Sequence, residues 1–135
     1  MKPNEMTVSD LMTTNLLTVN VNETIGEAHA EMEVGLVRHL PVIDERGRLV
    51  GVLSDRDLLG IAASRKPRRV ADVMTRHVVT TQPDAPAAVA ASMMLDHRIG
   101  SVLVVDEQET LVGMVTQTDY LEVARRALLG LPLER

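Results

Sequence analysis

Two stretches decide how this chain is organised: Gly51–Asp57, which reads Gly-Val-Leu-Ser-Asp-Arg-Asp, and Gly113–Asp119, which reads Gly-Met-Val-Thr-Gln-Thr-Asp. Each stretch runs from a short apolar segment, typical of a strand, into residues that favour the first turn of a helix. Each places a hydroxyl residue and, three positions later, an aspartate at that turn. We therefore predict two equivalent strand-to-helix turns, with the rest of the chain as the scaffold that holds them.

The two stretches belong to an internal duplication with a constant offset of 62 residues. Without a gap, 15 of the 52 residues from 8 to 59 are identical to the residue 62 positions later, as Met12 is to Met74. Agreement over so long a span in one register indicates two copies of one supersecondary unit. We expect repeat 1 at residues 6–63, a basic linker at 64–69, repeat 2 at 70–129 and a C-terminal tail at 130–135.

The composition predicts a soluble globular protein with an unusual core. Hydrophobic residues make up 45% of the 135, yet Phe, Trp and Cys are absent and Tyr120 is the single aromatic residue. The lack of cysteine excludes disulfides and thiolate metal sites, and no apolar run reaches the ~18 residues of a membrane span. The net charge of −5 argues against a general nucleic-acid binder. We expect a cytoplasmic protein without membrane or nucleic-acid partners.

Each repeat shows the element order β-α-β-β-α. A polar segment leads into a first strand, at 16–19 in one repeat and 78–81 in the other, and then into a helix. Asn22 or Thr24 can cap the first of these helices, and Asp84 followed by Pro86 is a standard start for the second. Two strands follow in each repeat, and these are apolar throughout, as expected where both faces of a sheet are covered. They lie at 40–43 and 49–53, and at 102–105 and 111–115.

A final helix begins at Ser54 in repeat 1 and at Thr116 in repeat 2. The apolar residues that we expect these helices to bury are Leu58, Leu59, Ile61, Ala62, Leu121, Ala124 and Leu128. A unit of about 55 residues buries too little surface to be stable alone. The predicted fold is therefore α+β, with the sheets of two β-α-β-β-α repeats packed together around a shared core and a pseudo-two-fold axis.

The motif Ser/Thr-x-x-Asp at each final helix has two interpretations. As a capping box, the hydroxyl accepts a hydrogen bond from a backbone N–H three residues on, and the aspartate accepts one from the hydroxyl residue's own N–H. As a ligand site, the helix N-terminus favours an anion, the aspartate accepts from the two hydroxyls of a ribose, and the preceding glycine leaves room for the ligand. The occurrence of the motif at both turns favours the ligand interpretation.

Further paired patterns make the chain resemble a known family, the tandem CBS (cystathionine-β-synthase) domains, or Bateman module. The patterns are Asp10-Leu11-Met12-Thr13, Leu40-Pro41-Val42-Ile43-Asp44 and their counterparts Asp72-Val73-Met74-Thr75 and Val102-Leu103-Val104-Val105-Asp106, besides the two Gly-x-x-Ser/Thr-x-x-Asp stretches. The resemblance covers about residues 6–128. It implies a regulatory module that binds adenosine-containing ligands such as AMP, ADP or ATP, with Mg²⁺ only where ATP carries it and no required cofactor.

The resemblance also implies which residues contact the ligand. Ser54 with Asp57, and Thr116 with Asp119, would contact phosphate and ribose. Residues just before the second strand line the same cleft, and the segment ahead of the first strand meets the base through backbone groups. Carried over to this chain, these further residues are Arg38, His39, Gly100 and Ser101, and Thr13, Thr18, Thr75 and Thr80.

The two repeats differ in charge near these residues. Arg38, His39 and Arg56 of repeat 1 correspond to Gly100, Ser101 and Thr118 of repeat 2. Because a di- or triphosphate needs cations, we expect the phosphate-contacting charge to come mostly from repeat 1. The alternative is that Arg38 and Arg56 are solvated surface charges.

The first helix of repeat 2 is apolar nearly all round, because Val89, Met93 and Leu95 replace three glutamates of repeat 1. A helix of this kind is covered on every side, either by the tail at 128–133 or by another subunit. Modules that resemble this one commonly pair through their helices. We therefore expect a homodimer with Val89 and Met93 in or near the interface.

We expect a non-catalytic adenine-nucleotide sensor, of the energy-sensing type, that signals to an unknown protein partner in trans. The sequence holds no nucleophile–base pair, no Walker-type loop and no metal-ligand spacing among its four histidines, so we expect no enzymatic activity and no metal site. The alternative is an assembly module that binds no ligand and uses both motifs only as helix caps.

Overall fold

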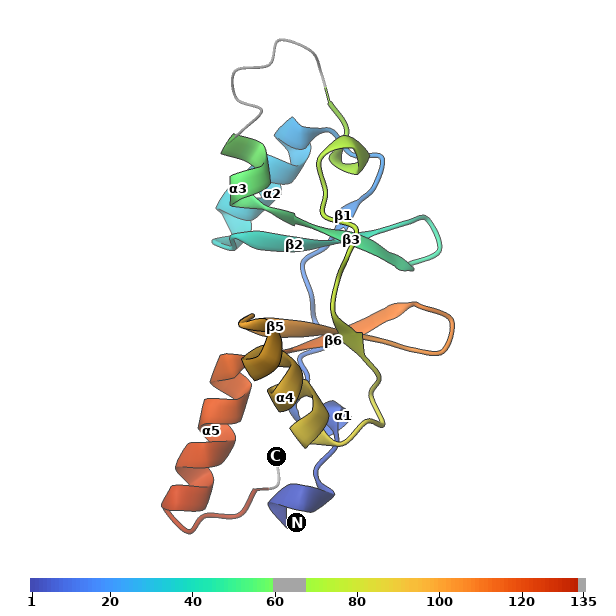
Figure 1. The fold of residues 1–135 in the computed structure, drawn as a ribbon. Coiled ribbons are helices and arrows are strands. Elements are labelled where there is room, and N and C mark those ends of the chain that lie inside the picture. Colours follow the sequence, from blue (N-terminus) through green and yellow to red (C-terminus); the bar gives the residue numbers. More distant parts are fainter. Residues whose placement is uncertain (60–67, 134–135) are drawn as a thin grey trace. The chain divides into compact units, whose positions relative to one another are not determined.

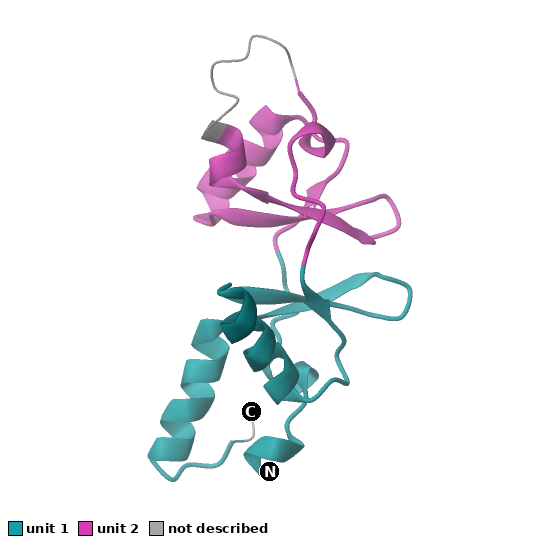
Figure 2. Ribbon diagram, in the orientation of Figure 1, with its two compact units in different colours: residues 1–16, 79–135 teal, residues 17–78 magenta. Residues whose placement is uncertain are grey.

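The computed structural model describes residues 1–59 and 68–133 (Figure 1). The chain forms two compact units, and each unit takes residues from both sequence repeats (Figure 2). Unit 1 consists of Met1–Leu16 and Val79–Arg135, and unit 2 of Leu17–Val78. The chain thus begins in unit 1, passes into unit 2 after Leu16 and returns after Val78.

Unit 2 is a three-stranded sheet with helices. Its elements are β1 (Val19–Asn20), α2 (Ile25–Gly35), β2 (His39–Ile43), β3 (Leu49–Ser54), α3 (Asp55–Leu59) and the 3₁₀-helix η2 (Val70–Asp72). The sheet order is β1-β2-β3, with β1 parallel and β3 antiparallel to the central strand β2. Thr24 is the cap of α2, because its side chain accepts a hydrogen bond from the N–H of Glu27.

Unit 1 has the same topology. Its elements are the 3₁₀-helix η1 (Pro3–Glu5), α1 (Val8–Leu11), β4 (Thr80–Thr81), α4 (Ala87–His97), β5 (Ser101–Val105), β6 (Leu111–Thr116) and α5 (Gln117–Leu128). The sheet order is β4-β5-β6, again with one parallel and one antiparallel pair. The predicted α+β fold and the order β-α-β-β-α are confirmed in both repeats. The first strands are shorter than predicted and begin at Val19 and Thr80, where pairing with the central strand starts.

The two β-hairpins show why the same aspartate stands in both. Asp44 accepts hydrogen bonds from the backbone N–H groups of Arg46 and Arg48 through one carboxylate oxygen, at 2.9 and 3.0 Å. Asp106 makes the equivalent pair of bonds in the hairpin between β5 and β6, at 2.9 and 3.0 Å. A carboxylate that binds its own turn in this way favours the reversal of the chain.

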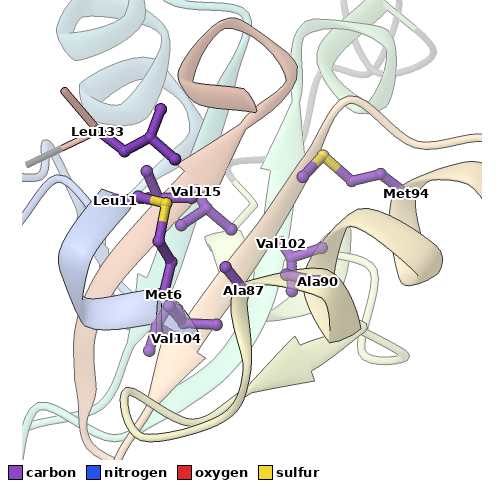
Figure 3. Packing of buried hydrophobic residues seen from close by; sticks show 10 residues of the cluster. Met6, Leu11, Ala87, Ala90, Met94, Val102, Val104, Val115 and Leu133 are labelled. Atoms are coloured by element: carbon purple, nitrogen blue, oxygen red, sulfur yellow. The ribbon is translucent and has the colours of Figure 1, made fainter. Parts of the chain in front are cut away.

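Each unit has its own aromatic-poor core. In unit 1, residues from both ends of the chain pack with β5, β6 and α4 (Figure 3), and the cluster consists of Met6, Val8, Leu11, Ala87, Ala90, Met94, Val102, Val104, Val115 and Leu133. In unit 2, the cluster consists of Val19, Ala28, Met32, Leu40, Val42, Leu53, Leu58, Val70 and Met74. Methionine, with three flexible torsions, fills the space that aromatic rings occupy in most cores.

The segment that leads into each repeat packs in the unit that holds the sheet of the other repeat. The leading segment of repeat 1 packs in unit 1, where Val8 is 0% and Leu11 3% exposed. Its Met6 carbonyl accepts the N–H of Ala87 at the start of α4, at 2.8 Å. The leading segment of repeat 2 packs in unit 2 through Val70 and Met74. Each compact unit is therefore composite in sequence.

The final helix of repeat 2 differs from the prediction. Leu121 is 71% exposed and Leu128 88% exposed, and Ala124 is exposed as well. The helix instead directs Tyr120 and Val123 towards the core of unit 1, and Leu133 of the tail is buried there. The prediction was wrong because an apolar stripe shows that a helix has a face suited to burial, without showing what covers it. The side chain of Leu59, Ile61, Ala62 and linker residues 64–67 lie outside the described residues.

Candidate functional site

The first candidate turn lies where β3 ends and α3 begins in unit 2. The backbone N–H of Ser54 donates to a carboxylate oxygen of Asp57 at 2.8 Å, and the N–H of Asp57 donates to the Ser54 hydroxyl at 3.2 Å. This is the reciprocal pair of a capping box. Both side chains are half-buried. Because each carboxylate oxygen has two acceptor positions, the cap leaves Asp57 with the capacity to accept further hydrogen bonds.

The second candidate turn, between β6 and α5 in unit 1, has the same geometry. The N–H of Thr116 donates to Asp119 at 2.8 Å, and the N–H of Asp119 donates to the Thr116 hydroxyl at 3.4 Å. The Thr116 hydroxyl also lies 3.2 Å from the same Asp119 oxygen. The capping interpretation of both motifs is thus confirmed, and it leaves the ligand interpretation open, since one carboxylate can do both.

The residues before the second strand meet each turn directly. His39 pairs with Ser54 across β2 and β3, and the carbonyl of Arg38 accepts the N–H of Asp55 at 2.9 Å. In unit 1, Ser101 pairs with Thr116, and the carbonyl of Gly100 accepts the N–H of Gln117 at 3.0 Å. The structure therefore brings these predicted residues to the same corner of each sheet.

The two corners differ in charge as the sequence indicates. At the corner in unit 2, Arg38, His39 and Arg56 are all exposed to solvent. At the corner in unit 1 the equivalent residues are Gly100, Ser101 and Thr118, which carry no charge. The exposed arginines beside the capped helix start in unit 2 are suited to an anionic group, since guanidinium groups donate to phosphate oxygens in pairs.

The four predicted threonines are divided between the two units. Each repeat has one of its two threonines in each unit. Thr13 pairs with Met114 of β6 in unit 1, whereas Thr18 precedes β1 in unit 2. Thr75 pairs with Val52 of β3 in unit 2, whereas Thr80 lies in β4 of unit 1. Each predicted segment ahead of a first strand therefore has one end on each unit.

Close contacts within the chain explain why the motif has a glycine at positions 51 and 113. A Cβ added at Gly51 would lie 2.8 Å from both Met74 Sδ and the Thr75 carbonyl oxygen. A Cβ at Gly113 would lie 2.7 Å from Met12 Sδ and 3.1 Å from the Thr13 carbonyl oxygen. The space that each glycine leaves is filled by a leading segment of the chain. The expectation that it makes room for a ligand is corrected accordingly.

Three residues near the turns were not among the site residues predicted from the sequence. Tyr120 follows Asp119, and its hydroxyl donates to the carbonyl of Ala87 at the start of α4. Burial, with a smaller effect of the Asp119 carboxylate, raises the pKa of Tyr120 to about 12. Met12 and Met74 lie against the glycines, and their identity at equivalent positions of both repeats was the signal that could have identified them.

Two features that mark other classes of protein are absent from the described residues. Among residues 1–59 and 68–133, no group of three or more His, Cys, Asp or Glu side chains is arranged to hold a metal ion. No helix in this part of the chain is long and apolar enough to cross a lipid bilayer.

The model of the CBS domain family matches this chain twice, at residues 8–64 and 70–126. The chain therefore belongs to the CBS domain family and carries a tandem pair of these domains. The resemblance identified from the paired motifs is confirmed.

Known relatives include enzymes and a protein of similar length. The chain is 33% identical over 121 residues to an inosine-5′-monophosphate dehydrogenase of Methanocaldococcus jannaschii, covering 90% of this chain and 23% of the enzyme. It is 30% identical to a CBS domain-containing protein of Dictyostelium discoideum, covering 93% and 95% of the two chains. The chain spans about a quarter of the length of the enzymes that it matches.

Solved structures with the same fold include two that hold ligands. CBSX2 in complex with AMP has a TM-score of 0.80 and 29% identity, covering 90% of this chain and 98% of that one. The CBS domain pair of protein MJ0100, in complex with 5′-methylthioadenosine and S-adenosyl-L-methionine, has a TM-score of 0.76 and 31% identity, with coverage of 90% and 98%.

Proposed function

We propose that this CBS domain pair is a non-catalytic regulatory module that binds an adenine nucleotide of the AMP, ADP or ATP class. The observation that carries the proposal is the duplicated turn, in which a half-buried aspartate caps a helix directly after a strand. The similar structures with AMP and with S-adenosyl-L-methionine support adenosine as the common part of the ligand. Asp57 and Asp119 would accept from the ribose hydroxyls.

In this proposal, the phosphate group lies at the Ser54 turn of unit 2. Arg38, His39 and Arg56 are exposed at the Ser54 turn, and a phosphate needs donors of this kind. The backbone around Thr13, Thr18, Thr75 and Thr80 would meet the base. Gly100 and Ser101 complete the corner at the Thr116 turn.

A thermal-shift panel with AMP, ADP, ATP, NAD, S-adenosylmethionine and GTP tests the proposal. A ligand present at a hundred times its Kd adds about 2.7 kcal/mol to the free energy of unfolding, which raises the Tm by about 5–10 °C. We expect one adenine ligand to give this shift in the wild type and none in Asp57→Ala/Asp119→Ala. Asp55→Ala is the matched control, because Asp55 lies in the same helical turn and takes no part in the cap.

Two comparisons keep this test free of artefacts. Because both aspartates cap helices, each variant is compared with its own ligand-free Tm rather than with the wild type. If phosphate lies at the Ser54 turn, Arg56→Ala should reduce the shift caused by ATP more than the shift caused by AMP. A shift that survives in the double mutant, or no shift with any ligand, would reject the proposed sites.

The module would act on a protein partner, either in trans or within a longer chain. Sensing requires that the ligand bind two states of the module with different affinities. The observation that supports a protein interface is the exposed apolar surface of α4 and α5, where Leu95 is 79%, Leu121 71% and Leu128 88% exposed. The same surface favours the second candidate function, a ligand-free assembly module, which a negative thermal-shift panel would leave as the better account.

We further propose that this surface forms a homodimer, with Val89 in or near the contact. Val89 is 38% exposed, whereas Met93 packs partly against the core of unit 1. A charge at position 93 would therefore disturb the core as well as an interface. Leu128→Glu and Val89→Glu are cleaner variants. Sedimentation equilibrium should show a dimer that these variants dissociate, and a monomeric wild type at high concentration would reject the dimer.

A further inference from the structure

The dipeptide Met12-Thr13 lies against β6, close to the turn of repeat 2. The N–H of Thr13 donates to the Met114 carbonyl at 2.9 Å, and the N–H of Met114 donates to the Thr13 carbonyl at 3.0 Å. Beside this pair, the Met12 side chain fills the space over Gly113, where an added Cβ would be 2.7 Å from its sulfur. A residue of repeat 1 is thus fixed to the strand that leads to Thr116.

The dipeptide Met74-Thr75 makes the same contacts with β3. Thr75 and Val52 exchange both backbone hydrogen bonds at 2.9 Å, and Met74 fills the space over Gly51. Met74 is 8% exposed and belongs to the core of unit 2. A residue of repeat 2 is thus fixed to the strand that leads to Ser54.

These contacts lie close to the turns along each strand, so they can affect the position of the capping residues. Met114 and Val52 each stand two residues before the capping hydroxyl, a separation of about 7 Å along a strand. On its other side, each strand is held by the sheet, where Ser54 pairs with His39 and Thr116 with Ser101. Each Met-Thr dipeptide therefore supports the outer edge of the strand that leads into one of the two turns.

We propose that Met12 and Met74 are positioning residues in a crossed arrangement: Met12 holds the Thr116–Asp119 turn and Met74 holds the Ser54–Asp57 turn. An unbranched, flexible thioether fits over the face of a glycine, where a branched side chain would not follow the same path. Each binding turn therefore depends on the leading segment of the other repeat. The expected effect of the two methionines on ligand binding rests on the proposed function. Their expected effect on the rigidity of the two turns does not depend on it.

Amide hydrogen exchange tests the inference without any ligand. In Met12→Ala, the amides of Thr116 and Asp119, which make the cap hydrogen bonds, should exchange faster than in the wild type, while those of Ser54 and Asp57 keep their protection. Met74→Ala should show the reverse. The two variants are matched controls for each other. If Met12→Ala does not fold, Met12→Leu replaces it, since Leu keeps the apolar volume and loses the unbranched shape.

Calorimetric titration with AMP tests the same inference at the sites. Asp57→Ala isolates the Thr116 turn, and Asp119→Ala isolates the Ser54 turn. In the Asp57→Ala background, Met12→Ala should weaken AMP binding by about three- to tenfold, equal to about 0.7–1.4 kcal/mol, and Met74→Ala should change it less than twofold. The Asp119→Ala background should reverse the two effects.

The outcomes separate this inference from the proposed function. If the wild type binds no AMP, the proposed binding of AMP fails, and the exchange experiment alone decides the crossed arrangement. If AMP binds and each methionine variant weakens both turns equally, the methionines act only through general stability and the inference is overturned. It is also overturned if Met12→Ala loosens the Ser54 turn, which belongs to its own repeat.

Discussion

Gly51 and Gly113 illustrate how a ligand motif can have a structural cause at the scale of single residues. Both glycines stand where a leading segment approaches the strand within the distance that a Cβ would occupy. The sequence predicted that each glycine leaves room for a ligand. It could not show that the approaching group was a methionine and a carbonyl oxygen of the same chain, because that contact joins residues far apart in sequence.

Substituting alanine for the two glycines should destabilise the protein to different extents. Gly113→Ala meets chiefly the flexible end of Met12, whereas Gly51→Ala meets the Thr75 backbone at 2.8 Å as well as Met74. Overpacking of this kind costs about 1–3 kcal/mol, and we expect Gly51→Ala to be the more costly. In urea unfolding, Met12→Ala/Gly113→Ala should be less destabilised than the sum of its single changes. Full additivity would contradict the contact.

Glu31 should lower the stability of the protein at neutral pH. Burial raises the pKa of Glu31 above its ordinary value of 4.5, and the neighbouring Glu23 and Glu27 raise it further. A raised pKa in the folded state favours the protonated form, so the contribution of this group is fully present below pH 4.5 and is lost as the pH rises through the folded-state pKa.

Glu31→Gln should therefore raise the Tm by about 1–3 °C at pH 7.5, and this gain should shrink as the pH falls towards 4.5, the ordinary value. Differential scanning calorimetry over this range is the measurement. Glu45→Gln, in the exposed hairpin turn, is the control for the change in net charge. An equal gain from both variants would show that the local environment of Glu31 has no effect.

The helices show where local patterns suffice to predict an element and where they do not. The predicted start of α4 at Asp84 and Pro86 was wrong, because α4 begins at Ala87, after Pro86, and has no side-chain cap. The caps of α2 and α5 followed from side chains that bind their own helix: Thr24, one of two candidates, and Thr116.

The buried face of α5 could not be predicted from local patterns. The stripe of Leu121, Ala124 and Leu128 is exposed, and Tyr120 and Val123 face the core instead. Both faces have helical spacing, and the choice between them depends on the neighbouring helix.

Tyr120 should connect α5 to α4 in an energetically measurable way. Removing its hydrogen bond to the Ala87 carbonyl in Tyr120→Phe should cost about 1 kcal/mol near pH 8. Because burial raises the pKa of Tyr120 from 10.0 to about 12, its contribution is present below pH 10.0 and lost as the pH rises through about 12. Tyrosinate absorbance, which reports this residue alone, should therefore appear near pH 12 or on unfolding, and titration near pH 10.0 would contradict the structure.

At the scale of the whole molecule, the duplication predicted the fold of each repeat and could not predict how the repeats are connected in space. Both leading segments carry the same Met-Thr pair, so either one matches either sheet by local pattern. The structure places residues 1–16 in unit 1 and residues 70–78 in unit 2. Long-range packing of Met6, Val8 and Leu11 with β6 and α4 accompanies this arrangement.

Paired cysteines can report this exchange directly, because the chain has no native cysteine. Hydrogen-bonded antiparallel pairs have Cα atoms about 5.5 Å apart, a distance that suits a disulfide. Thr13→Cys/Met114→Cys and Val52→Cys/Thr75→Cys should therefore cross-link within one chain under mild oxidation. The four single-cysteine variants are the controls for cross-links between chains. Failure of both pairs to cross-link within one chain would contradict the contacts of the leading segments with β6 and β3.

We propose that both capped turns of this CBS pair bind an adenine nucleotide. The most direct test of this proposal is calorimetric titration of the wild type, Asp57→Ala, Asp119→Ala and the double mutant, using the nucleotide that gives the largest thermal shift. We predict two sites per chain in the wild type, one in each single variant and none in the double mutant. Asp55→Ala should bind like the wild type. Unchanged binding by the double mutant would exclude both turns as the binding sites.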